Sequence, residues 1–212
     1  MRPKQSIWIG LFLSAALMTL AAKYYPSFPG DVALARWVQA LVPANREWAV
    51  LVSRAGEFPW LLLSLALVFG LSWALAGWRA ALAAVLSLGG MLALGSWLSP
   101  VIARPRPAPE LVQVWRPLSG FSFPSHSALR FAATWGFLAV LAWRQAAGVR
   151  RAVLLAVCTA LLILMAAARI ALGAHWPSDI LISYYLGLLW AAVLVRFALL
   201  RKVPSSRFQV PS

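Results

Sequence analysis

Six long apolar stretches alternate with short polar segments along this chain. They run over Ser6–Ala22, Pro59–Trp78, Ala80–Leu98, Ser127–Trp143, Ala152–Ala168 and Ile180–Leu200. A helix needs roughly 17 to 25 apolar residues to cross the hydrocarbon core of a bilayer. The alternation therefore predicts an all-α integral membrane protein, with six transmembrane helices in a single domain that covers residues 1–212.

Two of the connections between these stretches are long. Lys23–Phe58 contains a segment, Asp31–Val42, that has a helical pattern but is too short and too charged to span. We expect it to form a short helix at the membrane interface. The second long connection, Ser99–Ser125, is rich in Pro, Arg and Gly, which predicts an irregular loop.

Composition supports a membrane protein. Hydrophobic residues make up 62% of the chain and charged residues 11%, whereas soluble domains carry roughly 25% charged residues. The mean hydropathy is +0.80. The net charge of +14 does not indicate a nucleic-acid partner, because the basic residues lie between apolar runs and not along one soluble face. The single cysteine, Cys158, lies within an apolar run and predicts a small buried side chain.

Basic residues also predict the orientation. Six spans place both termini on one side, and ten of the 19 Lys and Arg residues fall on that side. Of the nine on the other side, four (Arg104, Arg106, Arg130 and Arg169) belong to the candidate site described next. The remaining bias places the termini in the cytoplasm. In a bacterial inner membrane, the opposite side is periplasmic.

The candidate chemistry lies on that outer side. Both histidines of the chain fall there, within Phe-Pro-Ser-His126-Ser and Arg169-Ile-Ala-Leu-Gly-Ala-His175-Trp-Pro-Ser-Asp179. Upstream, Arg104-Pro-Arg106-Pro follows the third apolar stretch. Arginine guanidinium groups make bidentate contacts to phosphate oxygens. The N-terminus of the fourth span, at Ser125, offers free backbone N–H groups to an anion.

The histidines supply what phosphoryl transfer requires. Asp179 lies four residues after His175, which on a helix places both on one face, so that the carboxylate orients the imidazole as a nucleophile. His126 could then protonate the leaving oxygen. No set of His, Cys and carboxylate residues suits a metal ion, so we expect neither a metal nor another cofactor. Glu57 and Glu110 are interpreted as loop carboxylates.

These motifs resemble those of the type 2 phosphatidic acid phosphatase family, which also includes acid phosphatases and vanadium haloperoxidases. The family pattern is Lys-x6-Arg-Pro, Pro-Ser-Gly-His and Ser-Arg-x5-His-x3-Asp. The resemblance implies that His175 forms a phosphohistidine, that Asp179 orients it, and that Arg106 and Arg169 hold the phosphate. The third motif matches from Arg169 to Asp179 in its spacing and charged residues.

The chain departs from the family pattern at three positions. The first-motif lysine is missing, since Ser99 or Trp97 stands in its place. The second motif carries His126 where the family has Gly and Ser127 where it has His. Ala168 replaces the serine of the third motif. Arg130, one helical turn beyond His126, could supply the missing charge, or its side chain could instead snorkel to the outer interface. Either His126 or Ser127 could fill the second-motif role.

The resemblance implies a membrane lipid phosphatase that acts on a lipid phosphate within the bilayer. Undecaprenyl diphosphate, phosphatidylglycerol phosphate, phosphatidic acid and lipid A are the substrates it suggests. The small size of the chain slightly favours undecaprenyl diphosphate. Two other functions use the same residues: a lipid phosphotransferase, and a non-catalytic protein that binds or transports lipid phosphates.

Overall fold

A computed structural model describes residues 5–199, and every regular element among them is helical. In chain order the elements are α1 (Gln5–Tyr24), α2 (Asp31–Leu41), α3 (Glu47–Arg54), α4 (Trp60–Ala76), α5 (Trp78–Ile102), α6 (His126–Phe131), the π-helical turn η1 (Ala132–Gly136), α7 (Phe137–Gln145), α8 (Gly148–Ala171) and α9 (Pro177–Leu199). The all-α prediction is confirmed for these residues. Leu200, the predicted end of the last span, lies outside them.

Among residues 5–199, four helices, α1, α5, α8 and α9, are long and apolar enough to cross a membrane. Helix α4 is apolar but shorter, with 17 residues. The fourth predicted span is divided among α6, η1 and α7. The chain thus has several helices of membrane-spanning length, and the number of six spans stays a prediction.

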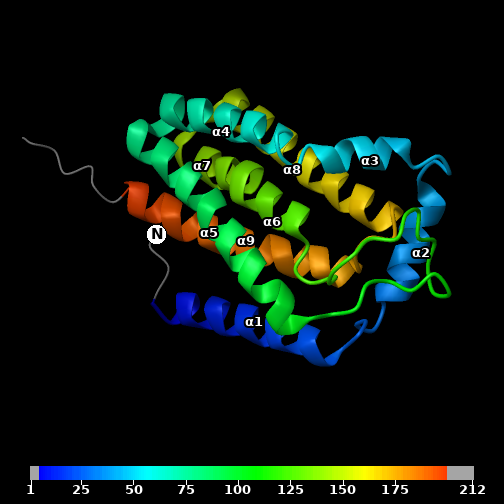
Figure 1. Cartoon of the computed structure of the whole chain (residues 1–212). Coiled ribbons are helices and arrows are strands. Elements are labelled where there is room, and N and C mark those ends of the chain that lie inside the picture. Colours follow the sequence, from blue (N-terminus) through cyan, green and yellow to red (C-terminus); the bar gives the residue numbers. More distant parts are fainter. Residues whose placement is uncertain (1–4, 200–212) are drawn as a thin grey trace, which may run out of the picture.

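The longer helices lie side by side in one bundle, with α1 along its edge (Figure 1). The short helices α2 and α3 lie together at one end, beside the long loop that connects α5 to α6. The first residues of α1 and the last of α9 lie at the opposite end. This arrangement separates a bundle of apolar helices from a polar end that carries the loops.

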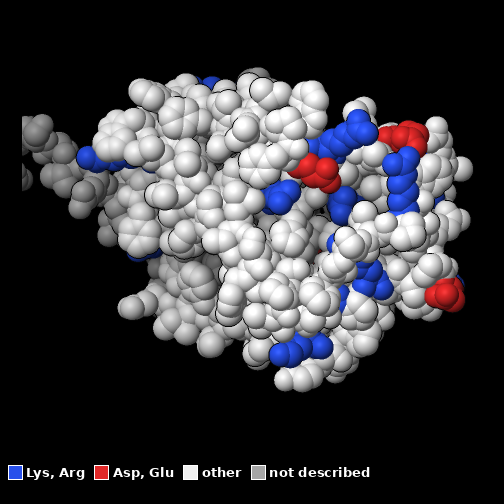
Figure 2. Space-filling view, in the orientation of Figure 1, with Lys and Arg blue, Asp and Glu red and all other residues white. Residues whose placement is uncertain are grey.

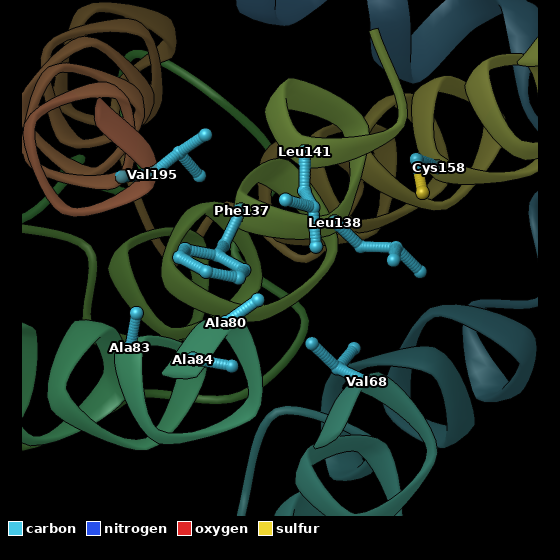
Figure 3. Close-up of a cluster of buried hydrophobic side chains, with 10 residues drawn as sticks. Val68, Ala80, Ala83, Ala84, Phe137, Leu138, Leu141, Cys158 and Val195 are labelled. Atoms are coloured by element: carbon cyan, nitrogen blue, oxygen red, sulfur yellow. The ribbon is translucent and has the colours of Figure 1, made fainter. Parts of the chain in front are cut away.

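Small residues let the helices of the bundle approach closely. A cluster of buried side chains joins α4, α5, α7, α8 and α9 around Phe137, with Ala80, Ala83 and Ala84 on α5 (Figure 3). Cys158 lies in this cluster, as expected for a small buried residue. Gly187 of α9 faces Ala132 so closely that a Cβ atom at this glycine would clash with the alanine side chain. Such close approaches stabilise helix pairs where lipid replaces water as the solvent.

Large apolar side chains cover much of the outside of the bundle. Leu17, Leu63 and Ile163 each expose more than half of their surface. In a protein surrounded by water such extensive apolar exposure would drive aggregation. It is the surface expected of helices that face lipid tails.

The loop of residues 103–125 is irregular, as predicted, yet it is held firmly in place. The side-chain amide of Gln39 on α2 donates to the carbonyl oxygen of Gln113 (2.8 Å), and its oxygen accepts from the Gln113 N–H (3.1 Å). The N–H of Trp115 donates to the carbonyl oxygen of Leu172 (3.0 Å). The loop is therefore attached both to α2 and to the turn between α8 and α9.

Helix α2 matches the predicted short helix, whereas α3 is not predicted from the sequence. The eight residues of α3 are too few for a clear apolar period, and it is stabilised instead by packing. Ala49 of α3 is fully buried against Ala168, Ala171 and Leu172 of the α8 end. The interfacial position of α2 stays a prediction.

The predicted orientation is tested by labelling single cysteines in a Cys158→Ala background. We expect Ser119→Cys to react with a membrane-impermeant thiol reagent added outside the cell, and Ala147→Cys to stay unlabelled. Both positions are exposed and lie in different connections of the bundle. Labelling of residue 147 alone would reverse the topology and place the site in the cytoplasm.

Candidate active site

A polar cavity lies at the end of the bundle that carries α2 and α3. Its volume is about 380 Å³, and we call it the main pocket. Its lining combines three arginines, both histidines and two further polar residues: Glu57, Arg106, His126, Ser127, Arg130, Arg169 and His175. Figure 2 shows that the charged side chains visible on this face of the molecule gather mainly at the same end. The fold therefore joins residues from all three sequence motifs in one cavity.

His175 lies in the turn between α8 and α9, two residues before α9 begins. Its Nδ1 atom lies 2.6 Å from the carbonyl oxygen of Ser122, which accepts only if Nδ1 carries the proton. Its Nε2 atom lies 3.0 Å from a guanidinium nitrogen of Arg169, which is always a donor. Both contacts require the same tautomer, with a proton on Nδ1 and a free electron pair on Nε2.

The surroundings of His175 keep its ring neutral. Burial lowers the pKa of the imidazole well below its usual value, and the nearby charges of Arg169 and Arg106 lower it further. A lowered pKa means that the ring becomes protonated only when the pH falls well below that of an exposed histidine. Nε2 therefore remains available as a nucleophile at neutral and mildly acidic pH.

Asp179 does not contact His175 in the way that the sequence predicts. Its Oδ2 atom lies 4.0 Å from Nδ1, beyond hydrogen-bond distance. The prediction assumed one helix for both residues, but His175 precedes α9, so the four-residue spacing does not place the two side chains on one helical face. Oδ2 instead accepts from the Ser122 hydroxyl and from the N–H of Trp176 (2.9 Å). Asp179 thus holds Ser122, whose carbonyl oxygen orients the ring.

Arg104 is the second departure from the predicted site. Its side chain is fully buried and does not line the main pocket. One guanidinium nitrogen donates to Asp179, and another lies 3.1 Å from Oδ2 of Asp31. Its Nε donates to the carbonyl oxygen of Tyr25 (3.0 Å). Both ion pairs of Arg104 are thus with buried carboxylates, and its side chain does not reach the main pocket, where the sequence predicts a phosphate contact for it.

Asp31, the first residue of α2, is a member of this network that the sequence does not reveal. Besides Arg104, its carboxylate accepts from the N–H of Phe28 (2.8 Å) and from both the N–H (2.9 Å) and the hydroxyl (2.6 Å) of Ser178. The helical pattern of residues 31–42 was the only available signal, and it does not indicate a partner 147 positions away. Asp31 therefore links α2 to the start of α9.

Two of the three arginines of the main pocket are fixed by backbone carbonyl groups, and the third, Arg169, contacts the ring of His175. Arg106 donates to the carbonyl oxygen of Ala174 (2.7 Å), and Arg130 to that of Gly56 (2.9 Å). Within residues 5–199, the Nε atoms of Arg130 and Arg169 are buried without a hydrogen-bond partner. Buried donors of this kind would be satisfied by an anion in the pocket. Arg130 lies in the wall, where it can supply the charge of the missing first-motif lysine.

The irregular second motif surrounds the start of α6. His126 and Ser127 both line the main pocket, so the structure brings both candidates for the second-motif role to the site. His126 packs against Gly95 of α5, where a Cβ atom would lie 3.2 Å from the ring. Ser125 precedes the helix and is fully buried, with its N–H donating to the Ser183 hydroxyl (3.0 Å). Ser125 is not among the lining residues of the pocket.

Gly173 allows the loop to reach His175. Its φ of +63° lies in the left-handed region, which glycine adopts without strain. A Cβ atom here would also clash with the carbonyl oxygen of Gln113. The turn before His175 and the 103–125 loop can therefore touch only if residue 173 is glycine.

Glu57 is a pocket residue to which the sequence assigns no chemistry. It follows α3, is exposed, and acts electrostatically on both Arg130 and Arg169. Across residues 5–199, no group of three or more His, Cys, Asp or Glu side chains could hold a metal ion. The site is thus a pocket of arginines and histidines with one carboxylate on its wall.

Comparison with known proteins identifies the family. The model of the PAP2 superfamily matches residues 80–202, more than half of the chain, so this protein belongs to the PAP2 superfamily. The resemblance to the type 2 phosphatidic acid phosphatases is therefore confirmed. The matched region contains all three motifs and four of the six predicted spans, but not α2 or α3.

Two kinds of relative accompany this match. The chain is 34% identical over 90 residues to phosphatidylglycerophosphatase B of Escherichia coli (strain K12) and of Shigella flexneri. The aligned part is 42% of this chain and 33% of each relative, so the chain spans about a third of the length of these curated proteins. The fold is similar to that of a transmembrane PAP2-type phosphatidylglycerolphosphate phosphatase from Bacillus subtilis, with a TM-score of 0.70 and 21% identity. That similarity covers 90% of this chain and 94% of the other.

Proposed function

We propose that this protein is a membrane lipid phosphatase that removes a terminal phosphate through a phosphohistidine on His175, without a metal ion. The observation that supports this most strongly is the tautomer of His175, whose unprotonated Nε2 lies beside Arg169 at a pocket with two further arginines. A neutral nucleophile next to fixed cations is what attack on a phosphate dianion requires.

In the first step, Nε2 of His175 attacks phosphorus and the bond to the lipid oxygen breaks. Arg106, Arg130 and Arg169 stabilise the charge on the transferred phosphoryl group. The N–H of Arg169 that contacts Nε2 exchanges this partner for a phosphate oxygen. His126 gives its proton to the leaving lipid oxygen. Water then attacks phosphorus and gives a proton back to His126, the P–N bond breaks, and inorganic phosphate leaves.

The names of the relatives favour phosphatidylglycerol phosphate as the substrate, whereas the small size of the chain favours undecaprenyl diphosphate.

The test is phosphate release from both lipids and from phosphatidic acid, by purified protein in detergent with EDTA present. We expect turnover of at least one lipid despite the chelator. Loss of turnover in EDTA that a divalent ion restores would contradict the metal-independent mechanism. Transfer of the phosphate to a second lipid would indicate a phosphotransferase, and binding without turnover a carrier protein.

His126→Ala tests the general acid. We expect a loss of roughly 10²-fold or more on a lipid monophosphate, whose alkoxide leaving group needs a proton. The loss should be distinctly smaller on an aryl phosphate, because a nitrophenolate leaves unaided. Ser127→Ala is the matched variant for the other candidate. Small and equal losses of activity on both substrates for His126→Ala would show that another group protonates the leaving oxygen.

A further inference from the structure

A smaller cavity adjoins the main pocket, and we call it the side pocket. Its volume is about 190 Å³. It lies between α3, the loop and the end of α8, and it is lined by Val50, Ser53, Arg54, Glu57, Trp115, Arg116, Leu118, Arg169 and Leu172. Glu57 and Arg169 line both cavities and so form the wall that they share.

The side pocket has its own positive charge. Arg54 is the last residue of α3, and no hydrogen bond or ion pair engages its guanidinium within residues 5–199. Arg116 lies 3.5 Å from Glu47, but both side chains are more than half exposed. An exposed pair of this kind is weak, so it does not prevent Arg116 from binding another anion. With Arg169, three arginines line this cavity together with the one carboxylate of Glu57.

The mechanism proposed above uses only the main pocket, which leaves Arg54 and Arg116 without a role. Glu57, on the wall shared by the two cavities, indicates which chemical group of a ligand would lie between them. A carboxylate repels phosphate, but it accepts hydrogen bonds from hydroxyl groups. The order along the site is therefore a cationic pocket, a hydrogen-bond acceptor, and a second cavity that carries two further arginines on a mainly apolar wall.

We propose that the side pocket binds a second phosphate of the substrate, separated from the scissile phosphate by a hydroxylated linker such as glycerol. The inference rests on the proposed function, which places the scissile phosphate in the main pocket. Arg54 and Arg116 bind the internal phosphodiester, and Glu57 accepts from the linker hydroxyl. The two phosphates of a lipid diphosphate share one oxygen and occupy the main pocket together, so the side pocket distinguishes phosphate–glycerol–phosphate from a diphosphate.

Binding to the catalytically inactive His175→Ala variant tests this independently of turnover. The probes are dioctanoyl phosphatidylglycerol phosphate, dioctanoyl phosphatidic acid and farnesyl diphosphate, titrated calorimetrically in detergent. We expect the two-phosphate glycerolipid to bind at least about tenfold more tightly than phosphatidic acid, since a hydrogen bond to a charged group contributes about 1.5–3 kcal/mol. Adding Arg54→Gln and Arg116→Gln should bring that ratio close to one. Lys23→Gln removes one exposed charge outside both pockets and should preserve it.

Equal affinity for the two glycerolipids in the parent variant would overturn the proposal. A preference for the two-phosphate glycerolipid that survives the double substitution would also overturn it. So would a loss of affinity for farnesyl diphosphate as large as the loss for phosphatidylglycerol phosphate. Turnover by the wild-type chain separates the two hypotheses. Hydrolysis of phosphatidic acid without a binding preference would refute only the side pocket. An arginine-dependent preference without hydrolysis of any lipid would refute only the phosphatase mechanism.

Discussion

Replacing His175 with alanine should lower phosphate release by at least roughly 10⁴-fold, because removal of a covalent nucleophile leaves only binding and electrostatic stabilisation. No other residue can take over the attack. His126 is the only other histidine of the chain, and it is His175 whose Nδ1 lies on the Ser122 carbonyl oxygen and whose Nε2 lies beside Arg169. The rate is measured on the lipid that the wild-type protein hydrolyses fastest.

Two controls make this result specific. The variant should elute as the wild-type protein does on size exclusion and remain folded, with a modest decrease in melting temperature, because the buried side chain gives up two hydrogen bonds but leaves no buried carboxylate without its cation. Acid-labile labelling from a ³²P-lipid should be seen in rapidly quenched wild type and be absent from His175→Ala. Activity within tenfold of wild type would show that the nucleophile lies elsewhere.

Replacing Arg104 with methionine should destabilise the protein by about 3–5 kcal/mol, the cost of leaving buried charges without their partner. The substitution leaves Asp31 and Asp179, whose side chains are 3% and 0% exposed, without a cation. The decrease is measured as a melting temperature in detergent. Adding Asp31→Asn should restore part of the stability, because it removes one of the unpaired carboxylates.

Arg106→Met is the matched comparison. Arg106 is partly exposed and lines the main pocket, so its loss should raise KM by roughly 10- to 100-fold with little change in melting temperature. The two arginines stand two residues apart in the sequence and are predicted to behave in opposite ways. If Arg104→Met were stable and only its KM were raised, the result would support the phosphate contact that the sequence predicts for Arg104.

The class of protein and most of its helices could be predicted from the sequence. Long apolar stretches specify helices wherever lipid forces the backbone to satisfy its own hydrogen bonds, so the all-α fold followed from hydropathy. The residues from Arg169 to Asp179 indicated the family because their spacing places an arginine, a histidine and a carboxylate around one turn. These signals are local, and a single sequence contains them.

The partners of those residues depend on the tertiary structure. Arg104 and Arg106 are equivalent in the sequence, but the loop directs one into the buried carboxylates of α2 and α9 and the other into the main pocket. The orientation of His175 depends on a backbone carbonyl 53 positions away, and backbone carbonyls leave no mark in a residue pattern. Arg130 lies in the wall of the main pocket. Asp31 of α2 and Arg54 of α3 belong to short helices outside the motifs, yet Asp31 binds Ser178 at the start of α9 and Arg54 lines the side pocket. Contacts between distant segments depend on how the helices pack, and hydropathy along the chain does not encode that packing.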